Sequence, residues 1–104
     1  MKISDTLTNQ KKELEFSDKV RIYLCGVTVY DQSHIGHART IIVFDTLRRF
    51  LEKNDVPVEI IQNFTDVDDK IINRAKEQGE SANGLSRKYI QTYFEDSDRL
   101  NIKR

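Results

Sequence analysis

Apolar and polar residues alternate over residues 20–25, where Val20, Ile22 and Leu24 are separated by more polar neighbours. This period of two is typical of a strand whose two faces differ in polarity. Over residues 36–54 the apolar residues recur every three or four positions instead, which predicts an amphipathic helix. The apolar face of that helix is expected to hold Val43, Phe44, Leu47, Phe50 and Leu51. A polar turn joins the two predicted elements.

Pro57 sets the end of this helix, because proline cannot continue a helix and pushes the residue before it toward extended geometry. Residues 58–62 then predict a second strand, with Ile60 and Ile61 as candidates for burial. The chain therefore offers two short strands on either side of one long helix.

A second helix is predicted after the second strand. Thr65 and Asp68 have the spacing of a capping box, although aspartate is a weaker partner there than glutamate. Gly79 is a natural C-terminal stop for this helix. The residues expected on its buried face are Val67, Ile71 and Ala75.

The two ends of the chain complete the pattern. Ser81 is a candidate cap for a third helix, expected over about 81–104. The apolar stripe of this helix comprises Leu85, Tyr89, Tyr93 and Leu100, and Asp96 interrupts it. Residues 1–19 are polar and are expected to form a short hairpin or an extended arm. The residues that would anchor this arm to the core are Ile3, Leu7, Leu14 and Phe16.

The order strand, helix, strand, helix predicts an α/β fold built on a βαβ unit, for which a right-handed parallel crossover is strongly favoured. A unit of this kind is half of a nucleotide-binding fold. A chain of 104 residues with 38% hydrophobic residues has room for one small domain and a small core. A single domain over residues 1–104 is therefore expected.

Charge and cysteine content narrow the function classes. The chain has 17 basic and 17 acidic residues, so a broad basic face for nucleic acid is not visible in it. A single cysteine cannot form an internal disulfide, which fits a reducing cytoplasm. No apolar run approaches the roughly 18 residues of a membrane span, and the N-terminus lacks the apolar stretch of a signal peptide. A cytoplasmic protein without a membrane segment is expected.

Both histidines of the chain fall in the turn before the long helix, in the run His34-Ile35-Gly36-His37. Free backbone N–H groups at a helix N-terminus, and about half a positive charge from the helix dipole, favour an anion there. Gly36 lets a flat ligand approach the backbone, because glycine has no Cβ. Two histidines three apart can also be ordinary surface residues. Their position between a strand and a helix favours a nucleotide or phosphate site.

Three motifs in order resemble the class I aminoacyl-tRNA synthetases, and within them the cysteinyl-tRNA synthetase family. They are CGVTVYD at 25–31, HIGHART at 34–40 and NFTDVDDKII at 63–72, and the opening residues 6–13 also fit the family's N-terminus. The family often has proline in place of Val27 and a second cysteine in place of Ser33. The resemblance covers essentially the whole chain but only the first part of such an enzyme. It implies a partial catalytic domain, the first half of a Rossmann-like fold, whose last helix leads into the connecting insertion.

The resemblance implies a ligase that activates cysteine with ATP and Mg²⁺ and passes the cysteinyl group from the adenylate to tRNA(Cys). It makes His34 and His37 the candidate catalytic residues, which donate hydrogen bonds to the phosphate oxygens as negative charge develops. Thr28 and Gly36 join them as candidate ATP-binding residues, and an ordinary loop hydroxyl is the alternative for Thr28. The tRNA is expected to contact regions of the family beyond this segment.

The resemblance also implies a zinc ion with Cys25 as one of its protein ligands. Cysteine and serine differ by one atom, so a pocket of side chains separates them by only about 10²-fold. Zn²⁺ prefers sulfur and so selects the substrate thiolate. In the family the other zinc ligands come from the later half, and on residue type alone Cys25 would be a small buried hydrophobe. The residues expected beside the bound amino acid are Gly26, Thr28 and Thr65.

Two groups of residues keep alternative interpretations. Asp66, Asp68 and Asp69 form an acidic run in the third motif. The helix dipole explains acidic side chains in a first helical turn, and a metal-binding cluster is the alternative. Tyr30 and Asp31 are candidates to line the amino-acid pocket, and core packing is the alternative for Tyr30.

Two other functions stay open from the sequence. A cysteine ligase of mycothiol synthesis forms the same adenylate for an amino-sugar acceptor and shares the histidine signature and the zinc. A non-catalytic nucleotide-binding module descended from the synthetase is the second alternative. The segment alone is expected to be inactive, because the family's second phosphate-binding signature is absent from these residues. Its unpaired sheet edge is expected to favour self-association.

Overall fold

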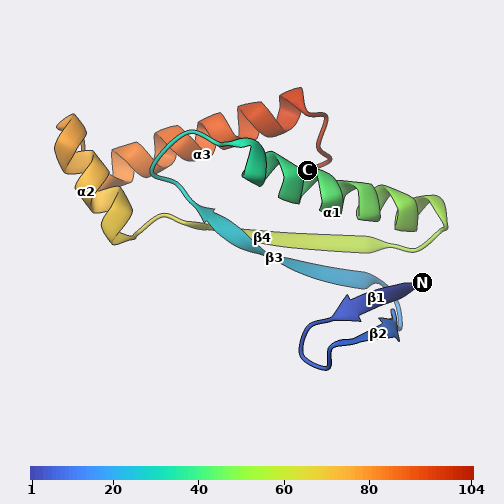
Figure 1. Cartoon of the computed structure of the whole chain (residues 1–104). Helices are drawn as coiled ribbons and strands as arrows, with labels where there is room; N and C mark the ends of the chain where they lie inside the picture. The colour runs from blue at the N-terminus through green and yellow to red at the C-terminus, as the bar shows by residue number, and fades with distance from the viewer.

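The computed structural model describes residues 1–104 as four strands and three helices (Figure 1). In chain order they are β1 (Lys2–Asp5), β2 (Gln10–Glu13), β3 (Val20–Thr28), α1 (Ile35–Lys53), β4 (Val58–Thr65), α2 (Asp69–Gln78) and α3 (Ala82–Arg99). Every predicted element is present, and none of the helices combines the length and apolarity needed to cross a membrane.

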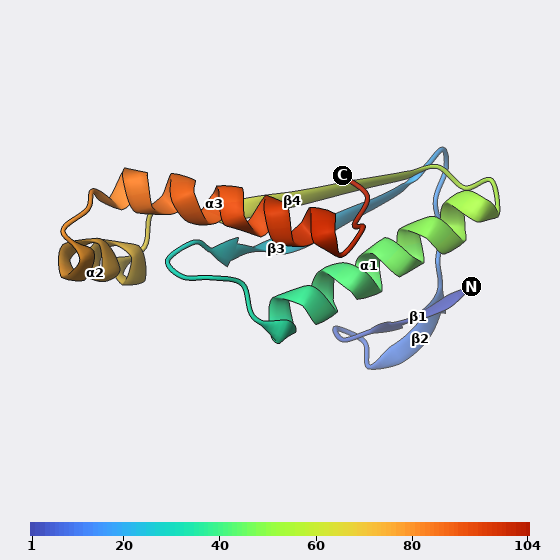
Figure 2. The ribbon, with the colours of Figure 1, turned by 90° about the horizontal axis from the view of Figure 1, so that it is seen from above.

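β3 and β4 form a parallel two-stranded sheet, and α1 makes the connection between them. The pairing runs from Val20 opposite Val58 to Thr28 opposite Thr65, which confirms the predicted parallel βαβ unit. Both strands are longer than predicted, because the ladder continues past the apolar runs that marked them in the sequence. α1 and α3 lie on one face of this sheet (Figures 1 and 2).

The pairing of β3 with β4 shifts between Leu24 and Val27, which is a β-bulge. Leu24 pairs with Gln62 and Val27 pairs with Phe64, so β3 carries one extra residue between these pairs. The alternation of inward and outward side chains therefore shifts by one at the bulge. The shift keeps Val27 on the same face as Leu24, and Val29 is buried. A regular strand would turn both valines outward.

The tightest part of the core lies where α2 meets the start of α3, beside the carboxyl end of the β3–β4 sheet. Its members are Val29, Ile71, Ala75 and Leu85. Before the bulge, β3 alternates as predicted, with Val20 and Leu24 buried and Tyr23 and Cys25 exposed. The predicted burial of Ile61 is wrong, since it pairs with Tyr23 and is exposed on the open face of the sheet.

α1 buries part of the predicted stripe: Leu51 is buried and Phe44 and Leu47 are half-buried. Ile41, Asp45 and Leu51 are buried, whereas Val43 is 56% exposed and Phe50 is 54% exposed. The predicted burial of Val43 and Phe50 is therefore wrong. Asp45 lies on the inward side together with Ile41 and Leu51, and its carboxylate accepts the Lys103 N–H there.

The start of α2 corrects two predictions. Its N-cap is Asp68, whose carboxylate accepts the Lys70 N–H at 2.8 Å. The predicted capping box is wrong, because β4 runs up to Thr65. Val67 lies before the helix and is 78% exposed, so it is not part of the buried face. Gly79 ends the helix with a φ of 68°, as predicted.

α3 begins at its predicted cap, since the Ser81 hydroxyl accepts the Gly84 N–H at 3.0 Å. Leu85 and Tyr93 are buried on the expected side. α3 ends at Arg99, so the prediction that this helix continues to about residue 104 is wrong. Leu100 lies beyond the last helical residue and is exposed, so its predicted place in the apolar stripe is also wrong.

The N-terminal segment forms the predicted hairpin, with β1 and β2 antiparallel. The hairpin makes a sheet of its own at one end of the β3–β4 sheet (Figure 1). Leu7 is 94% exposed, Ile3 and Phe16 are exposed as well, and only Leu14 is half-buried. The prediction that these residues anchor the segment to the core is wrong for Ile3, Leu7 and Phe16, because the hairpin forms a sheet separate from the β3–β4 sheet.

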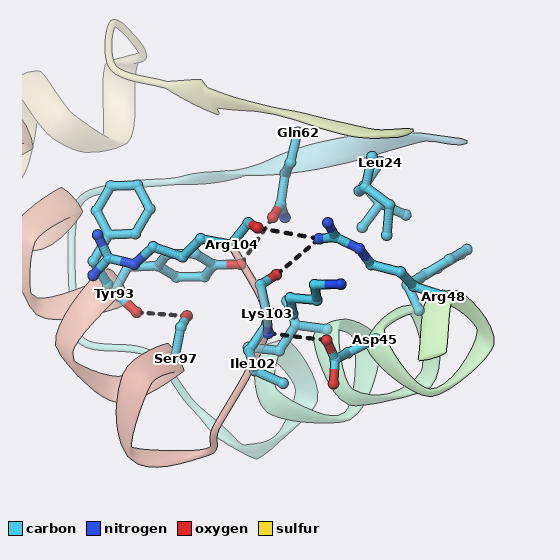
Figure 3. Close-up of a pocket in the computed structure, with 13 residues that line it drawn as sticks. Leu24, Asp45, Arg48, Gln62, Tyr93, Ser97, Ile102, Lys103 and Arg104 are labelled. Atoms are coloured by element: carbon cyan, nitrogen blue, oxygen red, sulfur yellow. Dashed lines mark hydrogen bonds between the residues drawn. The ribbon is translucent and has the colours of Figure 1, made fainter. Parts of the chain in front are cut away.

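The C-terminal residues fold back onto α1 (Figure 3). The buried Asp45 carboxylate accepts the Lys103 N–H at 2.9 Å and the Arg49 guanidinium at 2.6 Å. Arg49 also donates to the Asn101 carbonyl at 2.6 Å, and Arg48 donates to the Lys103 carbonyl at 3.1 Å. These contacts border a largely apolar cavity of about 240 Å³ between α1, α3 and the sheet.

Candidate functional site

The sequence motifs meet at a cavity of about 620 Å³ beside the carboxyl end of β3. Its walls include Cys25, Gly26, Thr28, His34 and His37, which are five of the predicted site residues. Ligands of open α/β sheets bind outside the carboxyl ends of the strands. The structure therefore brings most of the predicted site together where such folds bind their ligands.

The two histidines are part of the start of α1. His34 is the N-cap, and its Nδ1 accepts the Gly36 N–H at 3.0 Å. The Nδ1 of His37 accepts the His34 N–H at 3.2 Å, which completes a capping box built from two imidazoles. The rings stack with their centroids 3.9 Å apart and 24° between their planes.

These hydrogen bonds assign the proton positions on both rings. A neutral imidazole carries one N–H, and a nitrogen that accepts a hydrogen bond carries no proton. The N–H of each neutral ring is therefore at Nε2. Burial lowers the pKa of His37, and the neighbouring His34 lowers it further. The fold thus favours His37 as a neutral hydrogen-bond donor.

Gly36 is not among the residues that line the cavity. Its lack of a Cβ instead leaves room for the His34 ring. A Cβ at this position would lie 2.8 Å from Cε1 of His34. Glycine therefore lets the ring fold back over the first turn of α1. The approach of a ligand to this backbone stays a prediction.

The Cys25 thiol is exposed at the bulge of β3 and lines the cavity. The expectation from residue type alone, a buried hydrophobe, is therefore wrong. A soft sulfur donor at the cavity wall fits one ligand position of a zinc site. No group of three or more histidine, cysteine, aspartate or glutamate side chains in the chain is arranged to hold a metal ion.

The acidic run of the third motif is explained by the start of α2. Asp68 is the N-cap of the helix and Asp69 lies in its first turn. Negative side chains at these positions satisfy free N–H groups and interact favourably with the helix dipole. The interpretation of this run as a helix start is the one that the structure supports.

Thr28 and Thr65 lie opposite each other at the carboxyl end of the β3–β4 ladder. Thr28 lines the cavity, whereas Thr65 is not among the lining residues. The position of Thr28 fits its predicted contact with a phosphate or an amino acid. The place of Thr65 beside a bound amino acid stays a prediction.

Six other cavity residues were not predicted as site residues: Val27, Gln32, Thr40, Ile41, Gln62 and Lys70. Lys70 brings a positive charge, and its Nζ lies 5.7 Å from the centroid of the Tyr30 ring. The position of Lys70 within the third sequence motif was the signal that could have identified it as a site residue. Tyr30 lines the cavity and also packs against the core cluster, and its place beside a bound amino acid stays a prediction.

Asp31 connects the loop before α1 to α2. Its carboxylate accepts the Gln32 N–H at 2.8 Å and forms an ion pair with Arg74. The Gln32 hydrogen bond, together with the Arg74 guanidinium, holds the pKa of Asp31 below its usual range. The negative charge of Asp31 at the cavity wall is therefore matched by a cation.

A model of the family described as tRNA synthetases class I (C) catalytic domain matches residues 11–104. Relatives named cysteine–tRNA ligase from Gloeothece citriformis, Caldicellulosiruptor saccharolyticus and Clostridioides difficile are 52%, 53% and 55% identical over 98%, 100% and 100% of this chain. The chain spans 21%, 23% and 23% of the length of these relatives.

Among solved structures, Mycobacterium tuberculosis methionyl-tRNA synthetase in complex with methionyl-adenylate is similar to this chain, with a TM-score of 0.79. The match has 20% sequence identity and covers 84% of this chain and 17% of that chain. At this identity the similarity supports the fold.

Proposed function

The chain belongs to the family of class I (C) tRNA synthetase catalytic domains, and from this premise we propose that it is the ATP-binding and cysteine-binding segment of a cysteinyl-tRNA synthetase. In the proposed reaction the cysteine carboxylate attacks the α-phosphorus of ATP. A bond forms between this carboxylate and phosphorus, the bond to the β-phosphate breaks, and pyrophosphate leaves. The terminal hydroxyl of tRNA(Cys) then takes the cysteinyl group and AMP leaves. The names of the relatives support this assignment.

The observation that carries the proposal is the pair of histidines at one cavity, each with its Nδ1 bound to a backbone N–H. Each neutral ring has its Nε2–H free to donate to a phosphate oxygen as negative charge develops. The capping box orients the rings before any substrate binds, so little reorganisation is needed in the transition state. Thr28 supplies a third donor, and Mg²⁺ would neutralise the phosphates.

The amino-acid side of the site is proposed to be formed by Cys25, Gly26, Thr28 and Thr65. The exposed Cys25 thiol would be one ligand of a zinc ion, with the other ligands from a later part of the family's sequence. Zinc, when bound, would hold the substrate thiolate and discriminate against serine. Exposure of Cys25 at the cavity wall supports this role.

Partners and location belong to the same proposal. The tRNA is proposed to contact parts of the enzyme other than these residues, whose charges balance. A cytoplasmic location is supported by the family and by the lone cysteine. The mycothiol-type ligase and the non-catalytic module gain no support from these relatives, which are all named cysteine–tRNA ligase.

Self-association of the chain is proposed to occur through the free edge of β3. This strand pairs with β4 on one side only, and the hairpin adds no strand to the other side. Tyr23 and Ile61 lie exposed on the open face of the same sheet. Sedimentation velocity over a concentration series is expected to show growing species, and a single monomer at high concentration would contradict the proposal.

A chimera tests the function directly. The matching segment of the Clostridioides difficile relative is replaced by this chain, and cysteine-dependent exchange of pyrophosphate into ATP is measured. His34→Ala and His37→Ala are each expected to lower kcat by about 10²–10³-fold. Lys53→Ala, at the far end of α1, is the matched control.

Two outcomes would contradict the assignment. One is an inactive chimera that is folded and binds tRNA. The other is full exchange activity in the His34→Ala variant together with full activity in the His37→Ala variant. The isolated chain is expected to show no exchange.

A further inference from the structure

The bulge of β3 is held from the opposite strand by one side chain. Cys25 and Gly26 together oppose Asn63 of β4, where regular pairing would place one residue. A bulge leaves a backbone group without its partner in the ladder. Here the Gly26 N–H donates to Oδ1 of Asn63 at 2.7 Å, so the side-chain amide replaces the missing ladder bond.

The same oxygen of Asn63 accepts a second hydrogen bond. Its donor is the Tyr23 hydroxyl, at 2.9 Å. Tyr23 precedes Cys25 by two residues and Gly26 follows it directly, so one oxygen ties the strand on both sides of the cysteine. Both partners are donors, and the bonds therefore use the carbonyl end of the amide.

Gly26 is needed at the bulge for space. A Cβ at this position would lie 1.7 Å from the backbone carbonyl oxygen of Asn63. Gly79 is the only glycine with a positive φ, so backbone conformation is not the reason for Gly26. The two backbones approach so closely that only glycine fits, and this approach brings the Asn63 amide within reach of the Gly26 N–H.

We propose that Asn63 is a positioning residue for Cys25: its amide oxygen holds the bulge that sets the thiol at the wall of the cavity shared with His34 and His37. Asn63 is not among the residues that line this cavity, so it acts through Cys25. The inference rests on the proposed function, in which Cys25 faces the ligand. The placement of the thiol is nevertheless measurable without any ligand.

Cys25 is the only cysteine, so a nitroxide can be attached at this position alone. The label broadens nearby amide signals in nuclear magnetic resonance spectra, and the His37 amide reports on the cavity. Asn63→Ala is expected to reduce this broadening at His37. It is also expected to speed hydrogen exchange of the Gly26 amide about tenfold, as expected for one lost hydrogen bond. Asn73→Ala on α2 is the matched control and is expected to change neither.

Asn63→Asp keeps the experiment decisive where the alanine variant fails to fold. A carboxylate has the same shape and accepts from both donors, so it is expected to restore the broadening at His37. The Gly26 amide signal of this variant is expected to shift as the new carboxyl ionises near pH 4.

An Asp variant whose Gly26 signal does not follow that ionisation would overturn the proposal. A folded Asn63→Ala variant with lower stability and unchanged broadening at His37 would also overturn it, since the role would then be structural only. Failure of the proposed function would appear elsewhere, as a folded chimera without pyrophosphate exchange in any variant.

Discussion

The Nδ1 atom of His37 accepts the backbone N–H of His34 at 3.2 Å, while the two imidazole rings stack 3.9 Å apart. One candidate catalytic side chain therefore fixes the backbone of the other. The same contact is half of the N-terminal cap of α1. A change of charge on His37 is thus expected to act on both the site and the helix.

Protonation of His37 is expected to destabilise the fold. Burial and the neighbouring His34 hold the pKa of His37 below its usual value of about 6.5. The neutral ring's contribution to stability is therefore fully present above about pH 6.5 and is lost as the pH falls through the lowered pKa, because the unfolded chain binds the proton first. Urea denaturation at a series of pH values measures this loss.

His37→Gln is the control for this pH dependence. Glutamine at the same position accepts the N-cap N–H in an ordinary capping box and does not titrate. The stability of this variant is expected to change little between pH 5 and pH 7. An unchanged slope in the variant would assign the effect to a different group.

Ile71→Ala is expected to lower the free energy of unfolding by about 2–5 kcal/mol. Ile71 is 0% exposed in the core cluster, so the substitution leaves a cavity. The next residue provides a control on the same helix, since Ile72 is 37% exposed and Ile72→Ala is expected to cost under about 1 kcal/mol. Equal losses in the two variants would mean that α2 does not pack as described.

Two glycine substitutions separate space from backbone conformation. Gly26→Ala is expected to cost about 3 kcal/mol or more, because its Cβ would meet the Asn63 carbonyl oxygen at 1.7 Å. Gly79→Ala is expected to cost about 1–2 kcal/mol, because the φ of 68° is strained for alanine while no atom lies within 4 Å of its Cβ. Urea denaturation gives both values, and the reverse order would contradict the described bulge.

Asp45→Ala is expected to release the C-terminal residues from α1. The substitution leaves the Lys103 N–H and the Arg49 guanidinium without their carboxylate, at a cost of about 1–3 kcal/mol. Faster hydrogen exchange at the Lys103 amide is the specific readout. Asp66→Ala, in the exposed turn between β4 and α2, is the control. Unchanged exchange at Lys103 in the Asp45 variant would show that other contacts hold the tail.

Features that depend on a few neighbouring residues were predicted well from the sequence. The start of α1 was predicted at residue 36 and lies at Ile35, and the stop at Gly79 and the cap at Ser81 agree with the structure. The motif that holds Cys25 and the histidines also lies along one short stretch of chain. Helix ends and short turns are decided by hydrogen bonds within one turn of the chain, so their signals are visible in the sequence.

The bulge of β3 could be predicted only in part from the sequence. Apolar residues at 20, 22 and 24 continue at 27 and 29, and this change of phase was a visible signal that one residue is extra. The predicted strand ended at residue 25, so the bulge was not predicted. This signal indicates that a bulge is present. The residue opposite the bulge, Asn63, could be identified only from the pairing of β3 with β4.

The sequence by itself determined the order of elements, the parallel unit and the place of the histidines at a helix start. Only the tertiary structure decided that Val43 and Phe50 face outward, that Asn63 bridges the bulge, and which residues share the cavity. The reason is physical: these features depend on contacts between segments far apart along the chain, such as the Lys103 N–H bound by Asp45, 58 residues away. An apolar stripe allows several rotations and registers of nearly equal burial, and contacts between distant segments select one of them.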